Sequence, residues 1–190
     1  EHMGDLVNLL GSGIEFGCSF TFKVQDNPRG IAHALLLGEN FAGDDSILVI
    51  LGDNIATHSI RPYVQRFEDE EYGAKVLIKR VETPQHFGIA ALDERKIVSI
   101  QEKPDKPKSN YAVIGIYMYD NSVFNVIQGI DYSERGELEI TSVNNVYIDN
   151  NDLSYDILDG EWTDAGTLES YKMANDILYK IDNKIIEGDY

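Results

Sequence analysis

The chain has 190 residues, 43% of them hydrophobic and 26% charged, a composition that fits one soluble domain with its own core. Its formal net charge of -17 argues against nucleic acid or an anionic membrane as main partner, because either requires a basic face. The single cysteine, Cys18, excludes a disulfide framework, and no apolar run is long enough to span a bilayer, so we expect a protein of the reducing cytoplasm.

Apolar runs typical of strands alternate with segments of helical period in the first half of the chain. Strands are predicted at residues 17–24, 46–51 and 74–81. Helices are predicted at residues 31–41 and 60–67, with Pro62 tolerated in the first turn of the second. Strands that alternate with helices indicate a parallel sheet.

The middle of the chain has a different character, because three short strands follow one another through turns without a helix between them. These strands are residues 87–92, 97–102 and 112–119. Helices return at residues 121–129, 138–149 and 168–185. The order predicts a Rossmann-like α/β fold, with a mostly parallel sheet and an inserted antiparallel portion.

Two aspartates stand where a ligand-binding edge is expected. Asp53 follows the apolar strand Ile47 to Leu51, and ligands of open α/β sheets bind beyond the carboxyl ends of strands. Asp164 precedes the last helix, whose N-terminal cap is predicted at Gly166 or Thr167. The two carboxylates could share one Mg²⁺, a cation that prefers oxygen ligands. A purely structural role, as turn residue or helix cap, stays open for each.

Two further charged motifs suit a phosphorylated sugar. Strand alternation would place the side chains of Glu102 and Lys103 on opposite faces, unless Pro104 ends the strand at once. Pro104 is also expected to restrict the backbone of Lys103 to an extended conformation. Glutamate accepts hydrogen bonds from hydroxyls, while lysine meets phosphate. Arg135 lies just ahead of a predicted helix, where it could bind an anion together with free amides. The alternatives are an exposed charged turn and a surface cap.

Catalytic motifs of other classes are absent from the sequence. No G-x-G-x-x-G, G-x-x-x-x-G-K-[ST], H-E-x-x-H or G-x-S-x-G occurs, and Gly11-Ser12-Gly13 is interpreted as a turn. A zinc site and covalent hydrolysis are therefore not favoured.

Seven short motifs follow one another along the chain. They are Lys23-Val24-Gln25-Asp26 with Gly30-Ile31-Ala32, Ile50-Leu51-Gly52-Asp53-Asn54-Ile55, Phe87-Gly88-Ile89-Ala90, Gln101-Glu102-Lys103-Pro104, Pro107-Lys108-Ser109-Asn110-Tyr111-Ala112-Val113, Arg135-Gly136-Glu137-Leu138-Glu139-Ile140-Thr141 and Trp162-Thr163-Asp164-Ala165-Gly166-Thr167. In order and spacing they resemble the glucose-1-phosphate thymidylyltransferases of the short form, over nearly the whole chain. Seven motifs in register argue against chance agreement, although each alone would be weak.

The resemblance implies a role for each candidate residue. Gln25 and the backbone near Gly30 would read the thymine edge, and Asp53 and Asp164 would hold the metal. Gly88 and Glu102 would bind glucose hydroxyls, with Val113 lining that pocket. Lys103 and Arg135 are implied as the catalytic residues, because they would hold the phosphate of the sugar.

The resemblance also implies a reaction, a cofactor and two small-molecule substrates. Glucose-1-phosphate would attack the α-phosphorus of dTTP, with Mg²⁺ as cofactor, to give dTDP-glucose and pyrophosphate for deoxysugar biosynthesis. The alternatives are transfer to another sugar phosphate, transfer from UTP, and a non-catalytic sugar-nucleotide-binding chain. Homo-oligomerisation is left open.

Departures from the family pattern qualify this expectation. The family begins with a glycine-rich loop, G-G-x-G-[ST]-R-L, which does not occur here. We therefore expect residues 1–190 to form a single nucleotidyltransferase domain without the N-terminal strand, loop and helix, and to be inactive alone. Ser142 also stands where the family usually has an aspartate.

Overall fold

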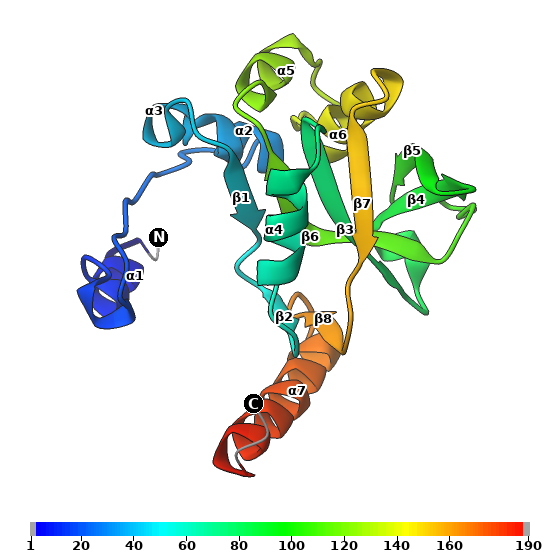
Figure 1. Cartoon of the computed structure of the whole chain (residues 1–190). Coiled ribbons are helices and arrows are strands. Elements are labelled where there is room, and N and C mark those ends of the chain that lie inside the picture. Colours follow the sequence, from blue (N-terminus) through cyan, green and yellow to red (C-terminus); the bar gives the residue numbers. More distant parts are fainter. Residues whose placement is uncertain (1–2, 188–190) are drawn as a thin grey trace.

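The computed structural model describes residues 3–187 and confirms the α/β class (Figure 1). The main sheet has the strand order β5-β4-β6-β3-β7, with β1 paired to β6, and β2 pairs with β8 in a second, small sheet. The strands are β1 (Ile47–Ile50), β2 (Asn54–Ala56), β3 (Ala74–Arg80), β4 (Gly88–Asp93), β5 (Lys96–Glu102), β6 (Tyr111–Tyr119), β7 (Leu153–Ile157) and β8 (Trp162–Asp164).

Helices cover both faces of the main sheet. The helices are α1 (Met3–Leu10), α2 (Ile31–Leu36), α3 (Glu39–Ala42), α4 (Arg61–Asp69), α5 (Val123–Gly129), α6 (Ile140–Asp149) and α7 (Leu168–Glu187), with short 3₁₀ turns η1 (Ile14–Phe16) and η2 (Pro84–His86). Helices α2, α5 and α6 lie on one face and α4 on the other. Pro62 stands in the first turn of α4, as predicted. None of the helices in the described residues combines the length and the apolar character that a membrane-spanning segment needs.

The main sheet is mixed, so the prediction of a mostly parallel sheet was wrong. Strands β1, β3 and β7 share one direction, but β6 pairs antiparallel with both β1 and β3 and separates them. Among the described strands, only β3 and β7 form a parallel pair. The physical reason is the inserted segment: no α-helix lies between β3 and β6 in the chain, and parallel neighbours need a crossover connection, usually a helix, so β6 returns antiparallel beside β3. The predicted antiparallel insertion, β4 and β5, is present.

The alternation of side chains along β3 explains why the sheet is covered on both faces. Ala74, Val76 and Ile78 belong to a core cluster that includes residues of α2, α5 and α6. Leu77 points to the other face, where it belongs to a cluster with Tyr63 of α4. A strand buried on both faces reads as a continuous apolar run, which is why β3 and β6 were recognised from the sequence.

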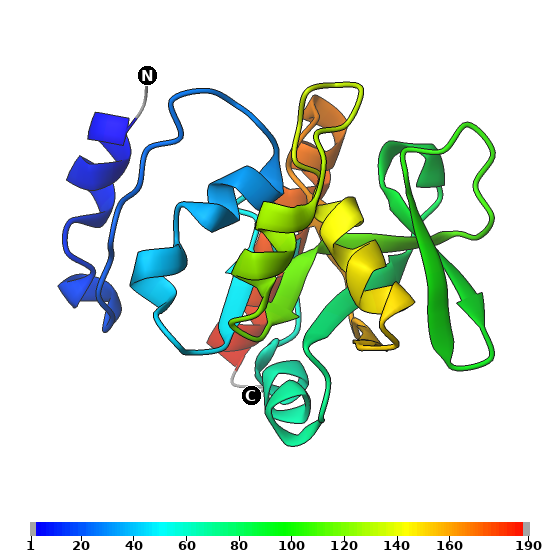
Figure 2. The same cartoon turned by 90° about the horizontal axis from the view of Figure 1, so that it is seen from above.

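Residues 17–24 are not a strand, although their alternating pattern predicted one. A strand needs a neighbour for its backbone N–H and C=O groups, and no described strand pairs with this segment. The ring of Phe20 instead lies against two other rings, with centroid distances of 5.7 Å to Phe16 of η1 and 6.3 Å to Phe22. Helix α1, which has no buried residue, lies apart from the sheet in both views (Figures 1 and 2).

Two other elements differ from expectation. The predicted helix at residues 31–41 is divided into α2 and α3 by a turn at residues 37–38, where the Gly38 N–H donates to the Leu35 carbonyl, three residues back, at 2.8 Å. Strand β7 was not predicted, since Ser154 and Asp156 make its sequence polar. Both polar side chains of β7 are hydrogen-bonded beneath α4, Ser154 to Glu70 and Asp156 to Lys75.

Candidate functional site

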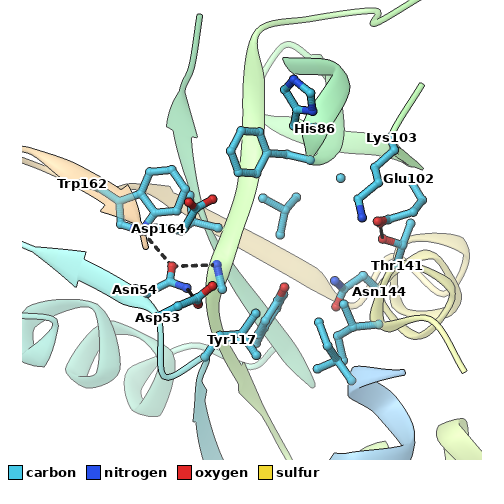
Figure 3. A pocket seen from close by; sticks show the side chains of 18 residues that line it. Asp53, Asn54, His86, Glu102, Lys103, Tyr117, Thr141, Asn144, Trp162 and Asp164 are labelled. Atoms are coloured by element: carbon cyan, nitrogen blue, oxygen red, sulfur yellow. Dashed lines mark hydrogen bonds between the residues drawn. The ribbon is translucent and has the colours of Figure 1, made fainter. Parts of the chain in front are cut away.

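The site begins where two strands separate along one edge of β6. On that edge β4 pairs with β6 at Ala112 and Val113, whereas β1 pairs with β6 only from Ile116 onward. Gly115 lies between the two pairings, and a cavity of about 260 Å³ opens there. Figure 3 shows its polar side chains pointing into this space from several elements.

A second cavity, of about 390 Å³, adjoins the first. The two share Ile31, Leu51, Glu102 and Lys103 as lining residues. Every candidate residue from the sequence lines one or both cavities. The first is lined by Asp53, Gly88, Val113 and Asp164, the second by Gln25, Gly30 and Arg135, and both by Glu102 and Lys103. The fold thus brings together residues that are up to 139 positions apart in the sequence, from Gln25 to Asp164.

The two aspartates meet through the small β2–β8 sheet. Asn54 pairs with Asp164 in its register, and the Ala165 N–H donates to the Asp53 carbonyl at 2.9 Å. A Cβ built on Gly166 would stand 3.6 Å from Asp164 Oδ1 and 3.9 Å from Asp53 Oδ2. Both carboxylates therefore have an oxygen within 4 Å of one point beside Gly166.

This pair of carboxylates fits the ligand chemistry of Mg²⁺, which is held by one or two protein carboxylates and completes its shell with water and phosphate oxygens. Asp53 is exposed, so water and substrate can reach it. The described residues contain no group of three or more His, Cys, Asp and Glu side chains that would suit a fully protein-bound metal. Asp164 also accepts a hydrogen bond from the Gly166 N–H at 3.1 Å, so it has a local structural role as well.

Asn54 organises this side of the cavity and was not recognised from the sequence. Its Oδ1 accepts from the Trp162 indole N–H at 2.8 Å and from the Gly115 N–H at 3.2 Å. Its Nδ2 donates to Asp53 Oδ1 at 2.9 Å. One amide of β2 therefore links the loop after β1 to β6 and β8. The sequence shows only an asparagine after Asp53, and nothing in the pattern indicates its distant partners.

The opposite wall is set by strand register. Gly88 of β4 lies directly across from Glu102 of β5 and from Val113 of β6. A Cβ on Gly88 would stand 3.3 Å from both Glu102 Oε2 and Thr141 Oγ1, so glycine keeps this wall hollow. Thr141 donates to Glu102 Oε2 at 2.6 Å and orients that carboxylate. Thr141 stands inside one of the seven motifs, but the sequence assigned it no role.

Lys103 does not have the extended backbone that Pro104 was expected to impose. Strand β5 ends at Glu102, and Lys103 has φ 41°, in the left-handed region. Its N–H donates to the Phe87 carbonyl at 3.0 Å, which holds this turn in place. A non-glycine residue before proline is rarely found there, and such backbones concentrate at functional sites. The turn brings Glu102 and Lys103 into the same cavity, which strict alternation would forbid (Figure 3).

Arg135 lies at the mouth of the second cavity among three carboxylates. Its guanidinium contacts Glu139 Oε1 at 2.7 Å, Glu137 at 3.6 Å and Glu102 at 3.7 Å. The hydrogen bond to Glu139 is the main cause of a raised pKa of Arg135, followed by burial, which opposes it, and by the nearby carboxylate charges. The side chain is 44% exposed, so an anion from solvent can still reach it.

The floor of the first cavity carries two polar side chains that the sequence analysis missed. Burial raises the pKa of Tyr117 well above its usual value, with Glu102 and Asp53 adding to the effect, so its hydroxyl stays protonated. Asn144 is 1% exposed, and its Oδ1 accepts from Tyr119 at 2.6 Å. Its Nδ2 has no hydrogen-bond partner among the described residues. Both lie among apolar residues, so no hydrophobic pattern marks them.

Comparison with known proteins agrees with this geometry. The family model described as nucleotidyl transferase matches residues 1–180. The chain is 38% identical over 187 residues to a glucose-1-phosphate thymidylyltransferase of Neisseria meningitidis, covering 96% of this chain and 65% of that protein. It is also 38% identical over 176 residues to the low-salt glycan biosynthesis nucleotidyltransferase of Haloferax volcanii, covering 92% of this chain and 49% of that protein. The chain thus spans about half to two thirds of the length of these curated relatives.

Solved structures show the same fold. A proposed glucose-1-phosphate thymidylyltransferase from Bacillus anthracis, in complex with a sucrose, superposes with a TM-score of 0.89 at 54% identity, over 93% of this chain and 72% of that one. A UDP-glucose pyrophosphorylase complexed with UDP-glucose superposes with a TM-score of 0.78 at 25% identity, over 93% of this chain and 73% of that one. The resemblance found in the seven motifs is confirmed, and the chain belongs to the nucleotidyl transferase family.

Proposed function

We propose that this chain is the sugar-phosphate and base-binding part of a glucose-1-phosphate thymidylyltransferase. A phosphate oxygen of glucose-1-phosphate would form a bond to the α-phosphorus of dTTP while the bond from that phosphorus to the β-phosphate bridging oxygen breaks. Pyrophosphate leaves and dTDP-glucose remains, and no proton transfer is required because the nucleophile is already an anion. The observation that carries the proposal is the junction of two cavities at Glu102 and Lys103.

The first cavity suits the glucosyl group. Glu102 offers a carboxylate oriented by Thr141, and Gly88 leaves room beside it for a hydroxyl. Tyr117 supplies a protonated hydroxyl at the floor. Phe87 and Trp162, whose rings meet edge to face at 5.8 Å, give the cavity an apolar boundary against which a sugar ring can pack.

The second cavity suits a pyrimidine base. Ile31, Ala34 and Leu51 provide apolar lining, while Gln25 provides an amide at the same wall. The loop before α2 is held close to residue 138, because the Leu138 N–H donates to the Arg29 carbonyl at 2.8 Å. Gly30 has φ 95° and its missing side chain lets this loop touch the Leu138 backbone, so a bulkier residue would displace the base-binding loop.

The charges between the cavities suit the reacting phosphates. Lys103 reaches into both cavities and Arg135 into the second, where each can bind the phosphate of the sugar. Asp53 and Asp164 would hold Mg²⁺, which when bound supplies positive charge that neutralises phosphate oxygens. The residues of the chain then act by holding two mutually repelling groups in line, and positioning of this kind lowers the barrier. A cytoplasmic location fits a reaction that consumes a nucleoside triphosphate.

The central test measures pyrophosphate release from dTTP and glucose-1-phosphate by the complete gene product. Lys103→Ala is expected to lower kcat by about 100-fold or more, since a phosphate clamp acts mainly in the transition state, while an exposed lysine adds little to stability. Lys106→Ala, also exposed but outside both cavities, is the matched control and should behave like the unmodified protein. Equal turnover of the Lys103 and Lys106 variants would remove Lys103 from the site.

The metal proposal has its own test. Asp53→Asn keeps the size of the side chain and removes a charge, so the Mg²⁺ concentration for half-maximal rate should rise, and Asp164→Asn should have the same effect. Asp45→Asn, an exposed aspartate outside both cavities, serves as control. An unchanged Mg²⁺ requirement in both site variants would contradict the assignment.

Transfer from UTP is the second candidate. An amide such as Gln25 contacts groups that uracil and thymine share, and the similarity to a UDP-glucose pyrophosphorylase favours testing it. Rates measured with dTTP and UTP at equal concentration separate the two candidates.

A further inference from the structure

The side-chain amide of Gln25 has a defined orientation. Its Nε2 lies 3.2 Å from the Gly30 carbonyl oxygen, which can only accept a hydrogen bond. The exchanged orientation would place two oxygen acceptors against each other. One amide hydrogen of Gln25 therefore points to Gly30.

The second amide hydrogen has a partner as well. Nε2 lies 2.7 Å from Nδ1 of His33, and an amide nitrogen donates but does not accept. Nδ1 of His33 is therefore the acceptor, and the ring carries its proton on Nε2. Both hydrogens of the Gln25 amide are used inside the protein, and this leaves only its oxygen for a ligand.

The position of His33 is itself fixed. It lies in the middle of α2, and this helix is attached at its start to residue 138, because the Ala32 N–H donates to the Leu138 carbonyl at 3.2 Å. Ala32 is fully buried. A histidine on such a helix can orient the Gln25 amide before any ligand binds, which is how supporting residues give a site its precision.

The free oxygen of Gln25 decides which base edge can be read. Gln25 lines the 390 Å³ cavity, and its Oε1 has no hydrogen-bond partner among the described residues. An acceptor at this position pairs with a base that presents an N–H. Thymine and uracil carry a hydrogen on N3, whereas cytosine has an unprotonated, accepting N3.

We propose that His33 is a positioning residue that holds the Gln25 amide with its oxygen toward the base, and so selects pyrimidines with an N3–H over cytosine. This inference rests on the proposed function only in taking the second cavity as the base site. It assigns a role to a residue that lines neither cavity.

The test is direct binding of dTTP, dCTP and N3-methylthymidine triphosphate to the complete gene product and two variants. His33→Leu keeps the volume and removes the acceptor. His33→Gln restores an acceptor through its own amide oxygen. The dTTP affinity of the leucine variant should fall about threefold to tenfold, the range expected for one neutral hydrogen bond, and its preference for dTTP over dCTP should fall by a similar factor. The glutamine variant should recover the preference.

The methylated nucleotide isolates the N3–H contact. The unmodified protein should lose affinity when N3 is methylated, and the leucine variant should lose less, because its Gln25 oxygen is no longer held in place. The role of His33 would be overturned if the leucine variant kept the dTTP preference of the unmodified protein, which includes the case of an equal loss of dTTP and dCTP binding. Unmodified protein that binds no pyrimidine nucleotide would instead overturn the proposed function together with this inference.

Discussion

Substitution of Gly115 by alanine should disturb the side chains that line the first cavity. A Cβ at this position would lie 2.6 Å from Asn54 Nδ2, 2.7 Å from Leu51 Cγ and 2.8 Å from Leu51 Cδ1. Such distances are shorter than carbon contacts allow, so Asn54 or Leu51 must move. Gly115 has no positive φ, so the effect comes from packing rather than from backbone strain.

The magnitude follows from the bonds that Asn54 makes. If Asn54 withdraws, the indole N–H of Trp162 and the N–H of Gly115 lose their acceptor, at about 1 kcal/mol each. Overpacking of a close-packed site adds about 1–3 kcal/mol. The free energy of unfolding should therefore fall by about 3–5 kcal/mol.

Urea unfolding followed by tryptophan fluorescence measures this directly, because Trp162 is the single tryptophan of the chain and reports on the disturbed contact. Gly129→Ala is the matched control, since a Cβ there meets no atom within 4 Å. The reasoning is refuted if Gly115→Ala unfolds within about 0.5 kcal/mol of the control and leaves the fluorescence of the folded state unchanged.

Two further substitutions test other parts of the structure. Lys75 is 1% exposed and donates to Glu70 at 2.8 Å and to Asp156 at 2.9 Å, so Lys75→Ala should lower the free energy of unfolding by about 3 kcal/mol in urea titrations. A decrease in the free energy of unfolding below about 1 kcal/mol would show that water can replace Lys75 as the hydrogen-bond donor to the two carboxylates. Gly88→Ala places a methyl group 3.3 Å from Glu102 Oε2, and steady-state kinetics should show the KM for glucose-1-phosphate raised about tenfold with kcat little changed. An unchanged KM would place the sugar elsewhere.

Much of the site could be predicted because its residues stand in short motifs beside strand ends. Asp53 comes soon after a strand and was expected at the ligand-binding edge, and Glu102 ends another strand in a charged motif suited to a sugar phosphate. Arg135 was a candidate from its place ahead of a predicted helix, whereas Gln25, Gly30, Gly88 and Val113 came from the resemblance alone. Their roles remain predictions, although the structure brings all of them to two adjoining cavities.

The sequence could not reveal residues whose role depends on distant partners. Asn54 is followed by Ile55, and nothing near it indicates the indole of Trp162, 108 positions away. Tyr117 lies within the apolar strand β6 and Asn144 within helix α6, and nothing beside either residue indicates the cavity that both line. The left-handed backbone of Lys103 contradicts the local preference of a residue before proline, and it is held by the carbonyl of Phe87, which directly precedes β4.

By itself the sequence determined most of the helices and strands of the main sheet, because period and apolar content act locally. Only the tertiary structure decided which strands are neighbours. Any strand can offer the same backbone N–H and C=O groups, so the pattern does not show that β6 lies between β1 and β3. Residues 17–24 show the same limit, because an alternating apolar pattern forms no strand when no neighbouring strand pairs with it. The cavity exists because β1 and β4 share one edge of β6 and part at Gly115, and pairing across the fold, not local preference, sets that point.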